Sequence, residues 1–537
     1  MKIRHTVLLA AALLATTVGS ANPPRLVVNI VVSSMRAEDL DRYRAGFGEG
    51  GFLRLASGVR YTSGEYDYMQ TTTPVSLATL STGALPSTHG VVSDHWFDYV
   101  DNRRIDLIVD RSVAGFGYTG MDGRFSPANL LAPTLGDALF AASADSRTVT
   151  VALEPSSAIV FGGQQGVAYW MEPSRIMWSS STHYMLNLPA WVEDYNRTRI
   201  NVSLLSDSWP LLRRPSVYVN RRRAVVELPA AKRNEQPAIK TVGITAAVTP
   251  YTGYDRLRYT PAGNAAVLGF AKQLLTKYAL GADAVPDVLN IVLDAPRFIA
   301  ECYGPESLEA EDMYYRLDEE LAEFLTYLFA QIKPEETLVV LTSDHGTSPS
   351  FDAAPKAAGR INLLQSEVIV NGFLNARHGQ GDWVTSVHDR SIWLNRDMIY
   401  NKGLNLADVQ EEVAAFVMQF RGVSHALSSA AMRSSYFGNG YGAKMQNGFY
   451  PRRSGDVVLN LMPGWTEESD SRRSDSGSMY GYDTRVPLLF YGWSLPQRVV
   501  TRRTPMTSVA PTVAAVLGIL PPAASEGDTL EEITGMK

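Results

Sequence analysis

Four short apolar segments constrain the fold of this sequence more than any other feature. They cover residues 25–33, 285–295, 337–343 and 486–492, and each is a nearly continuous run of apolar residues rather than an alternating one. Continuous runs of this length are typical of strands whose two faces are both buried, as in parallel sheets. We therefore expect these segments to be strands of a buried sheet.

Helical spacing occurs between these expected strands. Apolar residues recur every three or four positions in residues 133–142, 264–278, 312–331 and 406–420, which predicts a helix in each range. Buried strands that are separated by helices favour the α/β class, with a mostly parallel sheet and helices on both faces. In such sheets, ligands bind beyond the carboxyl ends of the strands.

The first residues have the features of a signal peptide, which we expect to cover residues 1–21. Lys2 and Arg4 precede a short apolar stretch, and Gly19-Ser-Ala21 offers small residues for cleavage. The alternative is a membrane anchor, but the stretch is short for a span and no long apolar run follows it. We therefore expect a periplasmic or secreted protein without a transmembrane span once the signal is removed.

The rest of the chain, residues 22–537, is expected to form one domain with two insertions. Residues 155–285 are rich in Trp, Tyr, Ser and Arg, and residues 350–455 contain glycine-rich loops. Both stretches interrupt the alternation of strands and helices. We interpret them as cap segments on the sheet.

Charge and cysteine content exclude several classes of protein. The chain has 49 Lys and Arg against 55 Asp and Glu, so its net charge of −6 gives no basic field for nucleic acid. Cys302 is the single cysteine, which excludes an intrachain disulfide framework and any cysteine-rich zinc or iron–sulfur site.

Two motifs offer chemistry. Asp344-His345-Gly346 follows an expected strand, where a carboxylate and an imidazole suit a divalent metal or a phosphoryl group. A hydroxyl-rich stretch that includes Thr73 precedes a short helix, whose N-terminus suits an anion. The alternatives are a strand-ending turn for the first motif and a helix N-cap for the second.

Several stretches, in one order along most of the chain, resemble a known family. They include Ala78-Thr-Leu-Ser-Thr-Gly83, Ser343-Asp-His-Gly346 and Tyr482-Asp-Thr-Arg-Val-Pro-Leu488. The chain resembles the type I phosphodiesterase/nucleotide pyrophosphatase group of the alkaline phosphatase superfamily, and especially its monomeric, threonine-dependent, phosphate-irrepressible alkaline phosphatases. The resemblance implies an alkaline-phosphatase-like fold, a monomer and two zinc ions. It also implies a metal-activated threonine that attacks phosphorus.

The resemblance carries few of the family's metal-contacting residues onto this chain. The nucleophile falls on Thr73, and the Asp-His ligand pair falls on Asp344 and His345. Four other positions are substituted: the first aspartate ligand is Ser33, the second metal's Asp-x-x-x-His is Arg297 and Glu301, and the late histidine ligand is Ser476. Glu301 could still bind a metal. The guanidinium of Arg297 would repel a divalent ion and would act as a built-in cation.

The phosphate contacts implied by the resemblance are also substituted. The asparagine that contacts phosphate falls on Asp94, and the Lys-x-Arg pair falls on Glu154 and Ser156. Negative charge thus replaces groups that attract a phosphate dianion.

These substitutions lead to three hypotheses. The first is an exported pseudoenzyme with a binding or structural role, whose partner is an unknown protein or small molecule. It has no cofactor, or zinc if the residual Asp344–His345 site is occupied. The second is a metal-dependent phosphomonoesterase or phosphodiesterase that uses Thr73, with replacement ligands such as His89, His95 or Asp98. The third is another enzyme class on the same fold, acting on a zwitterionic or cationic ligand.

Overall fold

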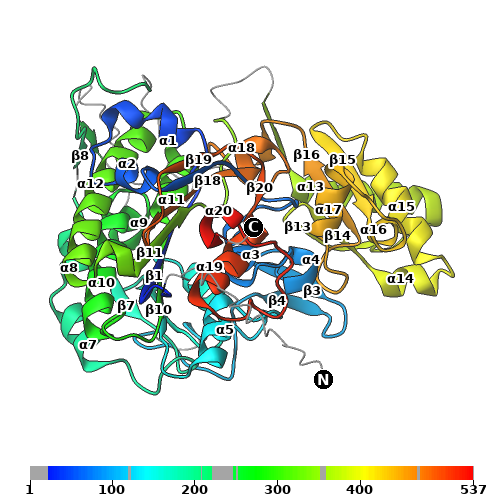
Figure 1. Cartoon of the computed structure of the whole chain (residues 1–537). Helices are drawn as coiled ribbons and strands as arrows, with labels where there is room; N and C mark the ends of the chain where they lie inside the picture. Colours follow the sequence, from blue (N-terminus) through cyan, green and yellow to red (C-terminus); the bar gives the residue numbers. More distant parts are fainter. Residues whose placement is uncertain are drawn as a thin grey trace, which may run out of the picture.

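The computed structural model describes residues 22–118, 122–206, 208–220, 246–248, 252–350, 358–468 and 472–535. The expected signal peptide, residues 1–21, lies outside them. The described residues form a ten-stranded central sheet in the order β19-β2-β18-β11-β1-β10-β5-β6-β7, with β20 beside β2 (Figure 1). The strands are β1 (Leu26–Val32), β2 (Val59–Glu65), β5 (Thr148–Val151), β6 (Val167–Glu172), β7 (Met177–Ser179), β10 (Asp287–Leu293), β11 (Thr337–Thr342), β18 (Arg485–Gly492), β19 (Arg498–Val500) and β20 (Thr504–Pro505).

The four apolar segments are strands β1, β10, β11 and β18, and the α/β class is confirmed. Strand β1 lies between β10 and β11 and is parallel to both, and all its residues are buried. Strand β18 is antiparallel to β11 and to β2. The sheet is therefore mixed, with a parallel centre, because a continuous apolar run reports burial on two faces but not strand direction.

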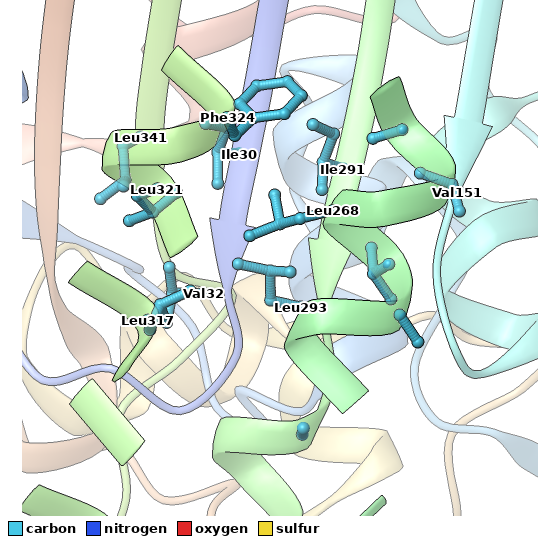
Figure 2. Close-up of a cluster of buried hydrophobic side chains, with 14 of the residues drawn as sticks. Ile30, Val32, Val151, Leu268, Ile291, Leu293, Leu317, Leu321, Phe324 and Leu341 are labelled. Atoms are coloured by element: carbon cyan, nitrogen blue, oxygen red, sulfur yellow. The ribbon is translucent and has the colours of Figure 1, made fainter. Parts of the chain in front are cut away.

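Helices cover both faces of this sheet. Alternate residues of β1 point to opposite sides, so Ile30 and Val32 contact one layer and Val27 and Val31 the other. The first layer contains α10 (Ala262–Lys277) and α12 (Leu308–Gln331), whose side chains meet the sheet in Figure 2. The second contains α3 (Thr73–Thr82), α5 (Leu135–Ala142), α6 (Pro155–Gly162) and α19 (Val509–Leu517).

The four predicted helices are present within the described residues. The ranges 133–142, 264–278 and 312–331 correspond to α5, α10 and α12, and 406–420 corresponds to α15 (Leu406–Val417). No helix that the structure describes is long and apolar enough to span a membrane.

A second, smaller sheet lies beside the first (Figure 1). Its order is β13-β14-β16-β15, and all its pairs are antiparallel. The strands are β13 (Val384–His388), β14 (Ser391–Leu394), β15 (Val423–Ser428) and β16 (Val457–Leu461), and α13 (Leu363–His378) and α15 pack on them with a core of their own. Most of the segment 350–455 belongs to this unit.

The segment 155–285 has a different place in the fold. It supplies α6 and strands β6 and β7 to the main sheet and then α7 (Ala190–Arg197), α9 (Gly253–Arg258) and α10. The limits of both insertions as cap segments stay predictions.

Candidate functional site

The carboxyl ends of three neighbouring parallel strands bring the motif residues together. Ser33 directly follows β1, and Asp344 and His345 follow β11. Arg297 lies in the first turn of α11 (Ala295–Tyr303), which begins after β10. Thr73 is the first residue of α3. The site therefore lies at the edge of the sheet where α/β proteins bind ligands.

Hydrogen bonds within the protein occupy both oxygens of the Asp344 carboxylate. The Ser33 hydroxyl donates to Oδ2 at 2.6 Å, and the backbone N–H groups of Ser34 and His345 donate to Oδ1 at 3.0 and 2.8 Å. Burial raises the pKa of this carboxyl, but His345 and the hydrogen bonds from Ser33 and Ser34 outweigh it, so the pKa is lower than usual. Asp344 is therefore an anion that the surrounding chain stabilises.

Thr73 and His345 form a contact that can polarise the threonine hydroxyl. His345 Nδ1 lies 2.6 Å from the carbonyl oxygen of Gly346, and because a carbonyl only accepts, Nδ1 carries the proton. In the neutral ring the opposite nitrogen, Nε2, is an acceptor, and it lies 3.2 Å from Thr73 Oγ1. The hydroxyl of Ser33 lies 3.5 Å from the same Oγ1.

Thr73 borders a polar cleft of about 140 Å³. Five of the positions named from the sequence line this cleft: Thr73, Asp94, Arg297, Glu301 and Ser476. Five further charged residues also line it: Asp389, Arg390, Glu467, Arg472 and Asp475. The structure thus places most of the substituted family positions around one space.

Arg297 contributes a positive charge to the cleft. Its guanidinium carbon lies 4.3 Å from the centre of the Phe298 ring, and its Nε is buried with no hydrogen-bond partner among the described residues. Burial by itself lowers the pKa of this guanidinium, but the carboxylates of Glu301, Asp294 and Glu154 raise it above its usual value. Arg297 is therefore a permanent cation among carboxylates.

Asp94 lines the cleft, and its side chain is exposed there. The partial loss of solvent in the cleft, together with the charges of Asp389 and Glu154, raises the pKa of Asp94 above its usual value, although Arg297 acts in the opposite direction. The Glu154 carboxylate is held by α9, since it pairs with Arg258 at 3.1 Å and accepts the Tyr254 hydroxyl at 2.8 Å.

Ser156 lies in the first turn of α6, two residues after Glu154. Neither of these two residues is among the described residues that line the cleft. The structure thus does not place Glu154 or Ser156 in the cleft.

The two zinc ions implied by the family do not fit these residues. In place of the second metal's ligands the cleft holds the Arg297 cation, which would repel a divalent ion by about 4 kcal/mol per unit charge at 4 Å for an effective dielectric constant of 20. At the position of the family's first aspartate ligand, the Ser33 hydroxyl stands in place of a carboxylate. This hydroxyl donates a hydrogen bond to Asp344, the ligand that is kept. Zinc at the residual Asp344–His345 pair stays a prediction.

Sequence reasoning missed the charged residues on the far side of the cleft. Asp389 and Arg390 form the turn between β13 and β14, and both have positive φ, 44° and 57°. Arg390 Nη2 donates to the Ser476 carbonyl at 2.8 Å and so connects the second sheet to the loop of the family's late histidine. No local pattern indicates this contact, because the turn lies far along the chain from every motif.

Comparison with known proteins agrees with this architecture. The family model described as type I phosphodiesterase / nucleotide pyrophosphatase matches residues 27–483, which is most of the chain. The chain belongs to this family. Alkaline phosphatase PafA of Elizabethkingia meningoseptica is 28% identical over 98% of this chain and 98% of its own length. Alkaline phosphatase PhoV of Synechococcus elongatus is 29% identical over 95% of this chain and 93% of its own.

The fold is also that of a family member of known structure. The crystal structure of wild-type alkaline phosphatase PafA superposes with a TM-score of 0.87 at 27% identity, and the match covers 96% of this chain and 99% of that one. The alkaline-phosphatase-like fold expected from the sequence is thus confirmed, and these relatives are named as alkaline phosphatases.

Proposed function

We propose that this family member is an exported pseudoenzyme, which keeps the alkaline-phosphatase-like fold and acts by binding rather than by hydrolysis. The observation that carries the proposal is the position of Arg297. Its guanidinium lines the cleft where the family resemblance calls for a metal ligand, and carboxylates keep it charged. Ser33 and Ser476 support the same conclusion, because neither offers the carboxylate or imidazole of the family.

The charges of the cleft argue against a phosphate dianion as its ligand. Carboxylates outnumber guanidiniums among the lining residues, with Asp94, Glu301, Asp389, Glu467 and Asp475 against Arg297, Arg390 and Arg472. A cationic or zwitterionic small molecule therefore suits the cleft better than a phosphate ester.

The proposal is tested by hydrolysis assays on the chain that begins at residue 22. We expect no turnover of an aryl phosphate or an aryl phosphodiester above that of Thr73→Ala, with or without added zinc. Thr326→Ala, which changes an exposed threonine on α12, is the matched control for handling and purity. Zinc-dependent turnover that Thr73→Ala abolishes and Thr326→Ala preserves would refute the proposal.

One observation favours a second candidate function, a phosphomonoesterase or phosphodiesterase with a remodelled site. The Thr73 hydroxyl lies 3.2 Å from His345 Nε2, which is within reach of a general base. This candidate predicts turnover that both Thr73→Ala and His345→Gln abolish. It also predicts bound metal in protein that is purified without chelator.

The proposal also includes three further statements: the protein is exported, it is a monomer, and it does not bind nucleic acid. The basic and apolar composition of residues 1–21 supports export, and the net charge of −6 argues against nucleic acid. Cell fractionation with and without residues 1–21 tests the localisation. Light scattering after size-exclusion chromatography tests the monomer, with about 59 kDa expected for the whole chain.

A further inference from the structure

Three side chains outside the family's metal positions converge at the border of the cleft. His95 begins β3 (His95–Asp98), His388 ends β13, and Asp389 begins the turn that follows. His95 Nε2 and His388 Nδ1 each lie 3.5 Å from Asp389 Oδ2. One ligand atom from each residue lies within 4.8 Å of the other two. The chain thus presents two imidazoles and one carboxylate to a common point.

The two distances of 3.5 Å between a histidine nitrogen and the Asp389 oxygen suit a metal ion better than direct hydrogen bonds. Ligand atoms of a tetrahedral zinc site with bonds of about 2.0–2.1 Å lie about 3.4 Å from one another. A good N–H···O bond is shorter, at about 2.9 Å. His388 Nδ1 is buried and has no hydrogen-bond partner in the described part of the chain, which is costly for a polar atom unless something else binds it.

The neighbouring residues hold the three side chains in place. The Ser93 hydroxyl donates to Asp389 Oδ2, and the Gln70 side-chain amide donates to the Asp389 backbone carbonyl at 2.7 Å. The Trp393 indole stacks on the His388 ring with their centres 3.9 Å apart. Hydrogen bonds of this kind fix ligand orientation in known metal sites.

We propose that His95, His388 and Asp389 form a mononuclear site for a divalent cation of the zinc type, separate from the family's bimetal site. Nitrogen and carboxylate ligands in this number suit zinc with an open coordination position. Asp389 lines the cleft, so water or a ligand in the cleft fills the open position. The excess of carboxylates over guanidiniums in the lining favours a cation there.

The site is tested with cobalt(II) as a spectroscopic substitute for zinc. Metal-free protein from residue 22 onward is titrated with Co²⁺ while visible absorption is recorded, and Zn²⁺ binding is measured by calorimetry. We expect one equivalent of Co²⁺ with the intense bands of a four- or five-coordinate ion. His95→Ala and Asp389→Asn should each weaken the binding of both ions at least a hundredfold.

Two control variants distinguish this site from a surface histidine that binds metal and from the family's own metal position. His378→Ala removes a histidine that pairs with Glu412 on the second sheet's helices, and Asp344→Asn removes the family's residual ligand. Both should keep the one equivalent of Co²⁺.

Three results would overturn the proposal. The unaltered protein would not bind Co²⁺, or His95→Ala and Asp389→Asn would bind it unchanged. Loss of binding in Asp344→Asn alone would also overturn it, since the ion would then occupy the family's site. Melting curves confirm that each variant is folded. If Asp389→Asn does not fold, His95→Ala alone tests the proposal, because His95 lies on a short two-stranded hairpin.

Discussion

His89 should make the protein measurably less stable in mild acid. The side chain is fully buried at the end of α4 (Pro86–His89). The Val91 N–H donates to Nδ1 at 3.1 Å, so Nε2 carries the proton and donates to Thr79 Oγ1 at 3.1 Å. Burial, together with the charge of Arg453, lowers the pKa of His89 to about 3. The ring is therefore neutral in the folded protein.

The size and sign of the effect follow from the two pKa values. The unfolded chain has a histidine pKa of about 6.5, so below that pH the unfolded state binds a proton that the folded state does not. The stability that the neutral His89 ring contributes is complete above about pH 6.5 and is lost as the pH falls towards 3. A pH of 5 is about 1.5 units below the pKa of a histidine in the unfolded chain, and this difference corresponds to about 2 kcal/mol of unfolding free energy.

Urea unfolding of the unaltered protein and of His89→Asn measures this loss. Asparagine keeps an acceptor for the Val91 N–H but does not titrate, so position 89 adds no pH dependence to the stability of the variant. We expect the stability advantage of the unaltered protein to shrink by about 2 kcal/mol between about pH 7.5 and pH 5.0. An advantage that is constant, or that grows in acid, would show that His89 is not a buried neutral ring.

Two further perturbations test the sheet and the cleft. Leu321→Ala removes a fully buried side chain between α12 and the sheet (Figure 2), and should cost about 2–5 kcal/mol in urea unfolding, whereas a loss below about 1 kcal/mol would contradict the packing. Arg297→Gln removes the charge that lowers the pKa of Asp94 and that of Asp294, which is about 7. Both values should rise further in carboxyl ¹³C NMR titrations. Because these acids must then ionise at a greater cost in the folded state, the variant's loss of stability should be larger at about pH 8 than at about pH 5. Unchanged titrations would mean that the guanidinium does not act on the cleft.

The centre of the fold could be predicted from the sequence because burial leaves a direct trace in it. Strands β1, β10 and β11 are buried on both faces, and their apolar runs show this without knowledge of their partners. The direction of β18 could not be predicted in the same way. Its run looks the same whether it pairs parallel or antiparallel, and its direction depends on where the second sheet returns the chain.

Part of the candidate site could likewise be predicted from the sequence, and part could not. Ser33, Asp344 and His345 follow strands that are adjacent in the sheet, so their meeting follows from strand order. The group of His95, His388 and Asp389 depends on how the β13–β14 turn packs against the loop before β3. That contact joins residues about three hundred positions apart and leaves no periodic or compositional pattern.

The position of β18 makes the central sheet depend on the last part of the chain to be synthesised. Strand β2, near the N-terminus, reaches the sheet only through β18, because β18 lies between β2 and β11. Until residues 485–492 are available, the backbone groups along one edge of β11 and both edges of β2 have no strand partner within the described sheet. Unpaired edges of this kind attract other chains, and contacts between such distant segments form slowly. A chain that ends before residue 485 should therefore aggregate rather than fold as a shortened version of the protein, and nascent chains need protection from one another until synthesis is nearly complete.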